Sequence, residues 1–463
     1  MLTRDSDGSR AWEKAQVLLK QGQYDDALEK LRYAASKGHV EALTLQGDLY
    51  AQGRHVKKDL KLARSLYLQA AKLGHSAAQY KLADCYLRGL GTSANPDKAA
   101  KWLLKAAEQG HSDAQFALGK CYMDGTGLSK DKQQAVKWYR KAAKQGHTDA
   151  QFALGKCYAD GKGVESDDTE AVRWYRKAAE QGHAEAQYAL GECYDDGEGV
   201  EPDPTEEVRW YRKAAEQGHA RAQYRLGFYY NYGLNGLQKS YTEATKWYRR
   251  AAEQGHAEAQ LSLGRCYEDG DGVPKDPKEA VKWYHKAAED VDIRHYSDYS
   301  ESESAWRAHF HLGRCYEHGV GVPKDPKEAV KWYQKAAEYG FPAAAKYSLG
   351  RCYEHGIGVP KDLKEAVKWY QEAAEQGYAD AQYALGDCYG NGNGVPKDPK
   401  KAVKWYQKAA ERHSREAQYS LGRCYEHGVG VPKDLKEAVK WYQKAAEKGD
   451  EDAIEKLREL NVR

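Results

Sequence analysis

The sequence predicts an all-α protein built as a right-handed α-α solenoid, a superhelix of stacked helix pairs. One pattern recurs eleven times at a period close to 36 residues, and such self-similarity is typical of repeat architectures. Each copy also carries helical periodicity and the signals that begin and end helices. The period is marked by ten tryptophans, spaced by 36 or 37 residues apart from one gap of 49: Trp102, Trp138, Trp174, Trp210, Trp247, Trp283, Trp332, Trp369, Trp405 and Trp441.

Residues 256–290 illustrate the first helix of a repeat. Their apolar side chains fall on one face of a helix that we expect over about 257–269. Gly264 lies beside that face, although glycine inside a helix costs about 1 kcal/mol relative to alanine. Because glycine recurs at this place in nearly every copy, we expect another helix to pass close to it. The equivalent residues are Gly119, Gly155, Gly191, Gly227, Gly313, Gly350, Gly386 and Gly422.

The second helix of the same repeat has a recognisable start. Gly270 and Gly272 can adopt the left-handed conformation that ends the first helix. Asp276, Pro277 and Glu279 then suit the N-cap, first and third positions of a new helix. Since neither helix can bury its apolar face alone, we expect the two to form an antiparallel pair.

The full pattern, A-x-x-x-L-G-x-C-Y-x-x-G-x-G-V-x-K-D-x-x-x-A-V-x-W-Y-x-K-A-A, resembles the Sel1-like repeat, a relative of the tetratricopeptide repeat with a longer loop between its helices. The resemblance covers roughly residues 38–449. It implies a protein that assembles complexes with other proteins. The expected repeats are 38–74, 75–110, 111–146, 147–182, 183–218, 219–255, 256–290, 304–340, 341–377, 378–412 and 413–449.

Four segments lie outside the repeats. Residues 1–10 are expected to be a flexible N-terminus, and residues 11–37, with their Gln-Gly-Gln-Tyr-Asp motif, resemble an ordinary tetratricopeptide unit that serves as the N-terminal cap. Residues 450–463 are expected to form a charged C-terminal capping helix, since terminal units of a solenoid need a polar outer face. The inserted loop 291–303 is rich in serine and acidic residues, which predicts a mobile surface segment where phosphorylation would add negative charge.

The overall charge points to no class of partner. The 463 residues include 72 basic and 69 acidic side chains, a net charge of +3, so no general attraction to nucleic acid or to an anionic membrane is expected. No apolar run approaches the ~20 residues that span a bilayer. Residues 1–10 are polar and lack the apolar segment of a secretory signal.

Nine cysteines occupy one position per repeat, which argues against disulfides and metal sites. Equivalent positions in neighbouring layers lie on the order of 10 Å apart, whereas a disulfide needs Cα atoms within about 7 Å. A disulfide-rich branch of the family pairs this cysteine with one in the following helix, where this chain has Ala287 and Ala288. We expect buried free thiols and a reducing, cytoplasmic compartment. The cysteines are Cys85, Cys121, Cys157, Cys193, Cys266, Cys315, Cys352, Cys388 and Cys424.

Two further recurring groups could carry chemistry, but packing explains both better. The Trp-Tyr pairs could form a ladder for stacking bases or a cofactor, yet each tryptophan shares a helix face with buried alanines, which favours a core role. Glu317 and His318 could bind a metal, but adjacent helix residues point about 100° apart and no third ligand is near. A pair between Arg314 and Glu317, three residues apart, is favoured instead. No catalytic constellation or nucleotide-binding motif stands out, so we expect neither enzymatic activity nor a cofactor.

Positions that differ between repeats are the best guide to a partner surface. On the first helix, four positions lie opposite the core, and by resemblance to tetratricopeptide proteins we assign them to a concave groove. In repeats three to five these positions are net acidic, and Asp113, Asp149 and Glu185 hold the first of them. From repeat eight onward the positions lean basic, and in repeat six they are aromatic.

This distribution predicts a bipolar groove with an aromatic centre that binds an extended segment or a helix of mixed charge. Aromatic and arginine side chains are frequent anchors of interfaces. The alternative is an ordinary solvated face that drifts between repeats. The predicted partner-binding residues are Arg221, Tyr224, Arg225, Phe228, Tyr232, Arg265, Arg307, Arg314, His318, Arg351, His355, Arg423 and His427.

The leading functional hypothesis is a non-enzymatic scaffold or adaptor that binds a protein or peptide. Head-to-tail self-association through the opposite charges of the two halves is a further option. A helical-repeat reader of single-stranded RNA is an alternative, which the acidic repeats and the near-neutral charge disfavour. A regulatory subunit of an enzyme complex is another.

Overall fold

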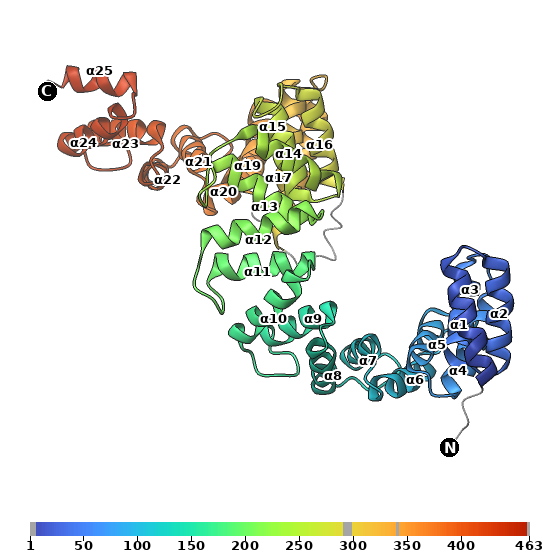
Figure 1. The fold of residues 1–463 in the computed structure, drawn as a ribbon. Helices are drawn as coiled ribbons and strands as arrows, with labels where there is room; N and C mark the ends of the chain where they lie inside the picture. Colours follow the sequence, from blue (N-terminus) through green and yellow to red (C-terminus); the bar gives the residue numbers. More distant parts are fainter. Residues whose placement is uncertain (1–5, 290–298, 339–341, 461–463) are drawn as a thin grey trace. The chain divides into compact units, whose positions relative to one another are not determined.

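The computed structural model describes residues 6–289, 299–338 and 342–460, which form 25 α-helices and no strand. Consecutive helices pack in pairs along the chain, as Figure 1 shows. The chain divides into two compact units, residues 1–222 and 223–463, and each unit is a stack of such pairs. The predicted all-α solenoid is confirmed. None of the helices described is both long and apolar enough to cross a membrane.

The first unit begins with an extra helix pair, α1 (Ser6–Lys20) and α2 (Tyr24–Ser36). Five repeats follow. Their first helices are α3 (Val40–Gln52), α5 (Ser76–Arg88), α7 (Ser112–Asp124), α9 (Thr148–Ala159) and α11 (Ala184–Asp196). Their second helices are α4 (Leu60–Lys72), α6 (Pro96–Glu108), α8 (Lys132–Lys144), α10 (Asp168–Glu180) and α12 (Pro204–Glu216).

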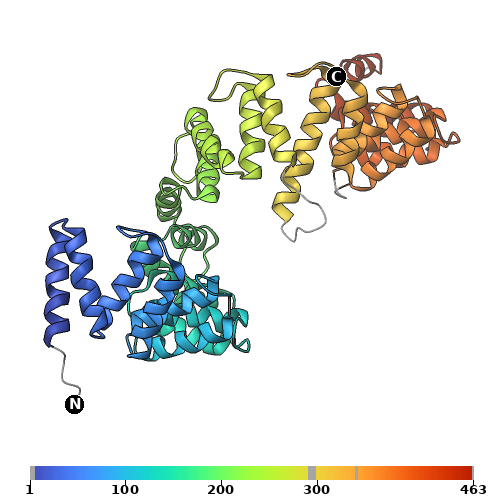
Figure 2. The same ribbon diagram turned by 90° about the vertical axis from the view of Figure 1, so that its right-hand side faces the viewer.

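The second unit holds six repeats and a final helix, which are seen from the side in Figure 2. The first helices are α13 (Ala220–Tyr232), α15 (Ala257–Asp269), α17 (Tyr299–His318), α19 (Ala343–His355), α21 (Ala379–Asn391) and α23 (Arg415–His427). The second helices are α14 (Tyr241–Glu253), α16 (Pro277–Glu289), α18 (Pro326–Ala337), α20 (Leu363–Glu375), α22 (Pro399–Glu411) and α24 (Leu435–Ala446), and α25 (Glu451–Glu459) ends the chain.

Most second helices begin as predicted, on an aspartate cap, while Asn95 caps α6 and Ser240 caps α14. The backbone N–H groups of Lys278 and Glu279 both donate to the Asp276 carboxylate, at 3.1 Å. Six first helices, all in the first seven repeats, use a histidine cap that was not predicted from the sequence. His147 accepts a hydrogen bond at Nδ1 from the Ala150 backbone N–H, 3.2 Å away. The same cap recurs at His39, His111, His183, His219 and His256.

Each histidine cap also joins two repeats. The His147 ring lies 4.8 Å from the Phe116 ring of the preceding repeat, and its Nε2 lies 3.3 Å from the Asp113 carboxylate. Because Nδ1 accepts the capping hydrogen bond, Nε2 carries the proton and can donate it to Asp113. The neutral imidazole therefore serves as a helix cap and as a bridge between layers.

A buried glutamine ladder satisfies further backbone groups between the layers. Gln115 donates its amide to the Ala107 carbonyl oxygen of the preceding repeat, at 3.0 Å, and accepts from Gln145 at 2.7 Å. Most repeats keep this glutamine, but His309 and Lys346 replace it in repeats eight and nine. Both replacements are buried, so an ionisable group occupies a place built for a neutral amide.

The glycine in the first helix is explained by a close neighbour, as predicted. The neighbour is the ring of the tyrosine that follows the recurring tryptophan on the second helix of the same repeat. A Cβ added to Gly386 would lie 2.6 Å from two ring carbons of Tyr406. Equivalent contacts recur at Gly119, Gly155, Gly191, Gly227, Gly264, Gly313, Gly350 and Gly422.

A second glycine, in the loop between the two helices, packs one repeat on the previous one. A Cβ on Gly430 would overlap the backbone carbonyl of Pro399, the first residue of α22. The φ angle of Gly430 is also positive, at 75°, so glycine meets both the spatial and the conformational demand. The same contact recurs at Gly91, Gly127, Gly163, Gly199, Gly272, Gly321, Gly358 and Gly394.

Two helices begin earlier in the sequence than predicted. The first helix starts at Ser6, so residues 6–10 are helical and the prediction of a flexible terminus over 1–10 is wrong there; Asp7 in the first turn suits the positive end of the helix dipole. Likewise α17 starts at Tyr299, so residues 299–303 belong to a helix and not to the inserted loop. Glu303 and Arg307 pair at 2.6 Å one turn apart and support this start. The rest of the predicted loop, 291–298, lies outside the described residues.

The glycine-tyrosine contact can be tested within one helix. We expect Gly386→Ala to lower the free energy of unfolding by about 1–3 kcal/mol, because its Cβ would overlap the Tyr406 ring. Gly390→Ala in the same helix places its Cβ 3.3 Å from the Tyr406 hydroxyl and 3.7 Å from the Ala402 Cβ. This control should be neutral or stabilising by up to about 1 kcal/mol, because alanine favours a helix. Urea unfolding midpoints measure both changes, and equal losses would contradict the assignment.

Candidate functional site

The strongest cluster of predicted partner-binding residues lies on three successive first helices of the second unit. We call it the aromatic-arginine surface. It comprises Arg225, Phe228 and Tyr232 of α13, Arg265 of α15, and Arg307 and Arg314 of α17. The pKa of Tyr224 is affected by Arg225, Arg307 and Tyr232, and the pKa of Tyr248 is affected by Arg265 and Tyr232. The three helices therefore contribute to one electrostatic environment.

Tyr224, which was also predicted to face a partner, is half-buried by contacts between layers. Its ring stacks on His256 with centroids 4.9 Å apart and tilts against Tyr248 at 5.9 Å. Burial raises the pKa of its hydroxyl. The position is opposite the core of its own repeat, but the next repeat covers it because a tyrosine is long enough to reach the following histidine cap. Tyr224 is therefore a packing residue between layers.

Phe228, which is half-buried, and Tyr232, which is exposed, form an aromatic pair on α13. They lie one helical turn apart with ring centroids 4.7 Å from each other. Tyr232 is 53 % exposed, and the nearby Leu234 is 39 % exposed. Other repeats place charged or polar residues at these two positions, for example Arg314 and His318 in repeat eight. Packing of the solenoid therefore does not demand aromatic residues here.

Three arginines of the surface, Arg265, Arg307 and Arg314, are exposed on α15 and α17. The Arg307 guanidinium pairs with Glu303 and lies 5.6 Å from the Trp306 ring centroid. An arginine on an aromatic ring is held in place while its planar face remains able to bind carboxylates.

A partly buried network of polar side chains between α15 and α17 was not predicted from the sequence. Glu268 on α15 accepts a hydrogen bond from the Tyr284 hydroxyl, and its carboxylate lies 3.4 Å from His311 Nδ1 on α17. His311, Tyr284 and Arg314 together hold the pKa of Glu268 at about 2. The carboxylate is thus ionised and joins two repeats under Arg314. The recurring R-C-Y-E-H-G motif is the signal that could have revealed it.

The equivalent glutamate of later repeats also accepts a hydrogen bond from the second-helix tyrosine. The predicted pairing of this glutamate with the arginine three residues earlier is therefore wrong. Glu317 accepts from the Tyr333 hydroxyl at 2.6 Å, and it lies 3.7 Å from Arg351 of the next repeat. Glu354 and Glu426 accept from Tyr370 and Tyr442. The reason is that the second-helix tyrosine, packed on the first-helix glycine, aims its hydroxyl at this position.

The remaining predicted residues of the second unit lie further along its first helices. His318, His355, Arg423 and His427 are exposed, and Arg351 is half-buried. His355 and His427 each lie beside the glutamate that precedes them, at 3.6 and 3.8 Å. The structure does not gather them with the aromatic pair, so their role in binding stays a prediction.

The first unit contains the acidic residues and Arg221. Asp113, Asp149 and Glu185 each lie 3.3–3.5 Å from the histidine cap of the following repeat. They remain more than half exposed. Arg221 is exposed at the end of the unit. The bipolar groove predicted across both units stays a prediction.

The cysteines, which could act as nucleophiles, are packed inside the repeats. Eight cysteines are buried and Cys424 is half-buried, all as free thiols. Burial raises the pKa of Cys85 to about 11 and that of Cys193 to about 12, so these thiols are poor nucleophiles near neutral pH. Throughout the described part of the chain, no group of three histidine, cysteine, aspartate or glutamate residues is arranged to hold a metal ion.

The tryptophans belong to the core, with a basic side chain over the ring. Trp138, Trp174, Trp210 and Trp283 are buried, which confirms the prediction for them, whereas six others are half-buried. Lys141 lies 3.8 Å from the Trp138 ring centroid, and similar contacts cover most of the series. The methylene groups of the lysine shield the exposed edge of the indole.

Comparisons with known proteins agree on one family. The model of the Sel1 repeat matches eleven segments: 40–75, 76–111, 112–147, 148–183, 184–219, 220–256, 257–292, 306–341, 343–378, 379–414 and 415–450. No curated protein matches the chain.

Two solved structures resemble the chain over most of its length. One is a protective antigen present in uropathogenic Escherichia coli strains that displays an SLR fold; it is 35 % identical, with 94 % of this chain and 90 % of that chain covered and a TM-score of 0.86. The other is a Sel1 repeat protein from Oxalobacter formigenes, 33 % identical over 70 % of this chain and 90 % of that chain, with a TM-score of 0.55.

The buried His309 predicts an acid-sensitive second unit. His309 is only 6 % exposed, and burial lowers its pKa to about 4. Between its unfolded pKa near 6.5 and pH 4, the unfolded chain binds more protons than the folded chain, so stability falls as the pH falls through this window. We expect the loss attributable to His309 to reach roughly 3 kcal/mol.

Denaturant unfolding at a series of pH values measures this loss. His309→Gln, which restores the residue of most other repeats, should flatten the dependence between pH 6.5 and 4. His318→Gln, at an exposed histidine of the same helix, is the matched control and should leave the dependence unchanged. A profile that His309→Gln does not alter would show that His309 is not the acid-sensitive group.

Proposed function

The chain belongs to the Sel1 repeat family, and from this premise we propose that it is a non-enzymatic scaffold that binds a protein or peptide through the aromatic-arginine surface of its second unit. Solenoids of Sel1 repeats are generally scaffolds for protein-protein interaction. Members of the family are generally not enzymes.

The observation that carries the proposal is the aromatic pair of half-buried Phe228 and exposed Tyr232. Exposed aromatic side chains cost solubility, and the solenoid fold does not need them at these positions. Tyrosine offers a large, rigid contact area with few rotatable bonds, which is why it is enriched where interfaces gain most of their affinity. A pair in contact can bury more apolar area against a partner than either ring alone.

The surrounding charge supports a partner that presents acidic groups near an apolar anchor. Arg265, Arg307 and Arg314 supply planar guanidinium groups that can bind carboxylates in a bidentate manner. The acidic first-helix residues of the first unit favour basic groups elsewhere on the same partner. A protein segment of mixed charge meets both conditions, whereas a nucleic acid would be repelled by the acidic repeats.

The mixed surface charge also suits self-association, which stays a prediction. If the opposite charges of two copies attract each other, the apparent mass in solution should fall as salt screens them. Light scattering at low and high ionic strength tests this. The buried free thiols favour a reducing, cytoplasmic location.

The proposed surface can be tested with peptides selected from a displayed random library on the purified chain. Selected peptides should combine acidic residues with an apolar anchor. We expect Phe228→Ala and Tyr232→Ala each to weaken their binding by about 2 kcal/mol, close to thirtyfold, because each removes an aromatic contact. Titration calorimetry with the wild type and variants measures the change.

Tyr33→Ala provides the matched control. Tyr33 is 46 % exposed on α2 of the first unit, so its loss removes the same side chain from a comparably exposed place. Its affinity for the selected peptides should equal that of the wild type. If both α13 variants also keep full affinity, the aromatic pair is not part of the binding site.

A further inference from the structure

The first repeat lacks the contact that joins most loops to the repeat before them. In nine repeats a loop glycine lies directly on the backbone of the residue that begins the preceding second helix, and in repeat six Asn235 stands at that place. In repeat one His55 holds that place, with a φ of 60°, and it faces Tyr24, the first residue of α2. The two rings stack with centroids 3.6 Å apart and an angle of 13° between their planes. A ring stack thus replaces the direct backbone contact and holds the loop away from α2.

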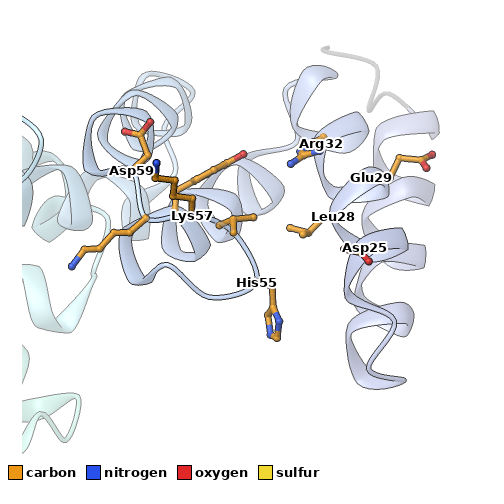
Figure 3. A pocket seen from close by; sticks show the side chains of 10 residues that line it. Asp25, Leu28, Glu29, Arg32, His55, Lys57 and Asp59 are labelled. Carbon is orange, nitrogen blue, oxygen red and sulfur yellow. The ribbon is translucent and has the colours of Figure 1, made fainter.

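The spacing leaves a cleft of about 800 Å³ between α2 and the loop that joins α3 to α4. It is lined by Asp25, Leu28, Glu29, Arg32, Tyr50, His55, Val56, Lys57, Lys58 and Asp59. Figure 3 shows Leu28 and Arg32 facing the loop from α2, with Lys57 on the opposite side and Glu29 pointing away. A non-glycine residue with positive φ is uncommon and costs free energy, so the loop conformation is maintained by the histidine stack.

Some charged side chains of the cleft already have an ion-pair or hydrogen-bond partner, and others have no ion pair. Glu29 pairs with Lys30 at 2.7 Å, and Asp59 accepts the Leu62 backbone N–H at 2.9 Å as the cap of α4. Among the described residues, no ion pair involves Arg32, Lys57 or Lys58. Three cations therefore line the cleft together with the carboxylates of Asp25 and Asp59, while Glu29 points away. The cleft carries an excess of one positive charge, which an anionic ligand can neutralise.

The walls between these charges are apolar. Leu28 is buried and lies between the helix and the loop, and Val56 and Tyr50 are half-buried beside it. The cleft is far larger than a lone inorganic anion, and its volume lies in the range of sites that hold a drug-sized group or several residues of a peptide. A ligand that fills it must combine an anionic group with an apolar one.

We infer that this cleft is a second binding site, which takes a peptide segment carrying carboxylates next to apolar side chains. Arg32 and Lys57 bind the carboxylates from the two sides, and Leu28 and Val56 contact the apolar side chain. The site belongs to the first unit and is independent of the aromatic-arginine surface.

A fluorescein-labelled acidic peptide of alternating Glu and Leu is a suitable probe, with the Gln-Leu analogue as its neutral counterpart. Fluorescence anisotropy at low ionic strength should detect binding of the acidic peptide and much weaker binding of the analogue. The double variant Arg32→Ala and Lys57→Ala should weaken binding about tenfold or more, because two charge-assisted contacts are lost. Lys61→Ala removes an equal charge from exposed α4 outside the cleft and should change affinity less than about twofold.

The variant His55→Gly distinguishes binding inside the cleft from general electrostatic attraction of the peptide. It leaves the arginine, lysines and carboxylates of the cleft in place but restores the glycine of nine other repeats, so the loop can settle on α2 and the peptide should bind more weakly. The unfolding midpoint should stay unchanged or rise, which distinguishes this result from unfolding. Tyr232→Ala separates the two sites, since it alters the other unit: binding of the probe that Tyr232→Ala removes belongs to the aromatic-arginine surface, and binding that remains there but is lost in the Arg32 and Lys57 double variant belongs to the cleft.

Three results would overturn the inference. Equal affinity for the Gln-Leu analogue would exclude recognition of carboxylates. Displacement of the peptide by inorganic phosphate at equal concentration would show a site for a free anion. Unchanged affinity in the Arg32 and Lys57 double variant would place the peptide elsewhere.

Discussion

In nine of the eleven repeats the stack depends on one contact between backbones, made where a loop glycine of one repeat lies on the first residue of the second helix in the preceding repeat. A Cβ at Gly358, for example, would overlap the Pro326 carbonyl. Since this contact involves no side chain of the loop residue, it fixes the distance between layers regardless of what the rest of the surface carries. Hydrogen bonds of the histidine caps and glutamine ladder then align the layers that the contact has brought together. Solenoids gain their stability from such interfaces between neighbours.

Because regular positions meet these packing demands, variation elsewhere is free to serve recognition. The exposed ring of Tyr232 lies where other repeats carry charge, and it contributes nothing to the contacts between layers that are described above. His55 illustrates a different kind of departure: it alters the packing contact itself and opens a cleft as a result. The aromatic-arginine surface and the cleft thus arise from two separate changes to one repeated design.

The sequence predicted what depends on local rules and failed where side chains reach across layers. Asp276 and Pro277 predict a helix start because they act on backbone groups within a few residues, and α16 begins at Pro277. The glycine at 264 correctly indicated a close neighbour. By contrast, Tyr224 was assigned to a partner surface because the helical wheel of a single repeat does not show the histidine that covers it from the next. The glutamate of the R-C-Y-E-H-G motif was matched with a nearby arginine, although its partner is a tyrosine hydroxyl on another helix.

The dependence of the stack on the loop glycine is tested most directly by comparing Gly358→Ala with Gly255→Ala in denaturant unfolding. Both glycines have positive φ, at 71° and 89°, so both substitutions strain the backbone. Only Gly358 packs against another repeat, since nothing lies within 4 Å of a Cβ at Gly255. If the contact determines the stack, Gly358→Ala will lose about 1–3 kcal/mol more than Gly255→Ala, the usual range for overpacking. Equal losses would mean that the glycines serve only the loop conformation, which would contradict the account.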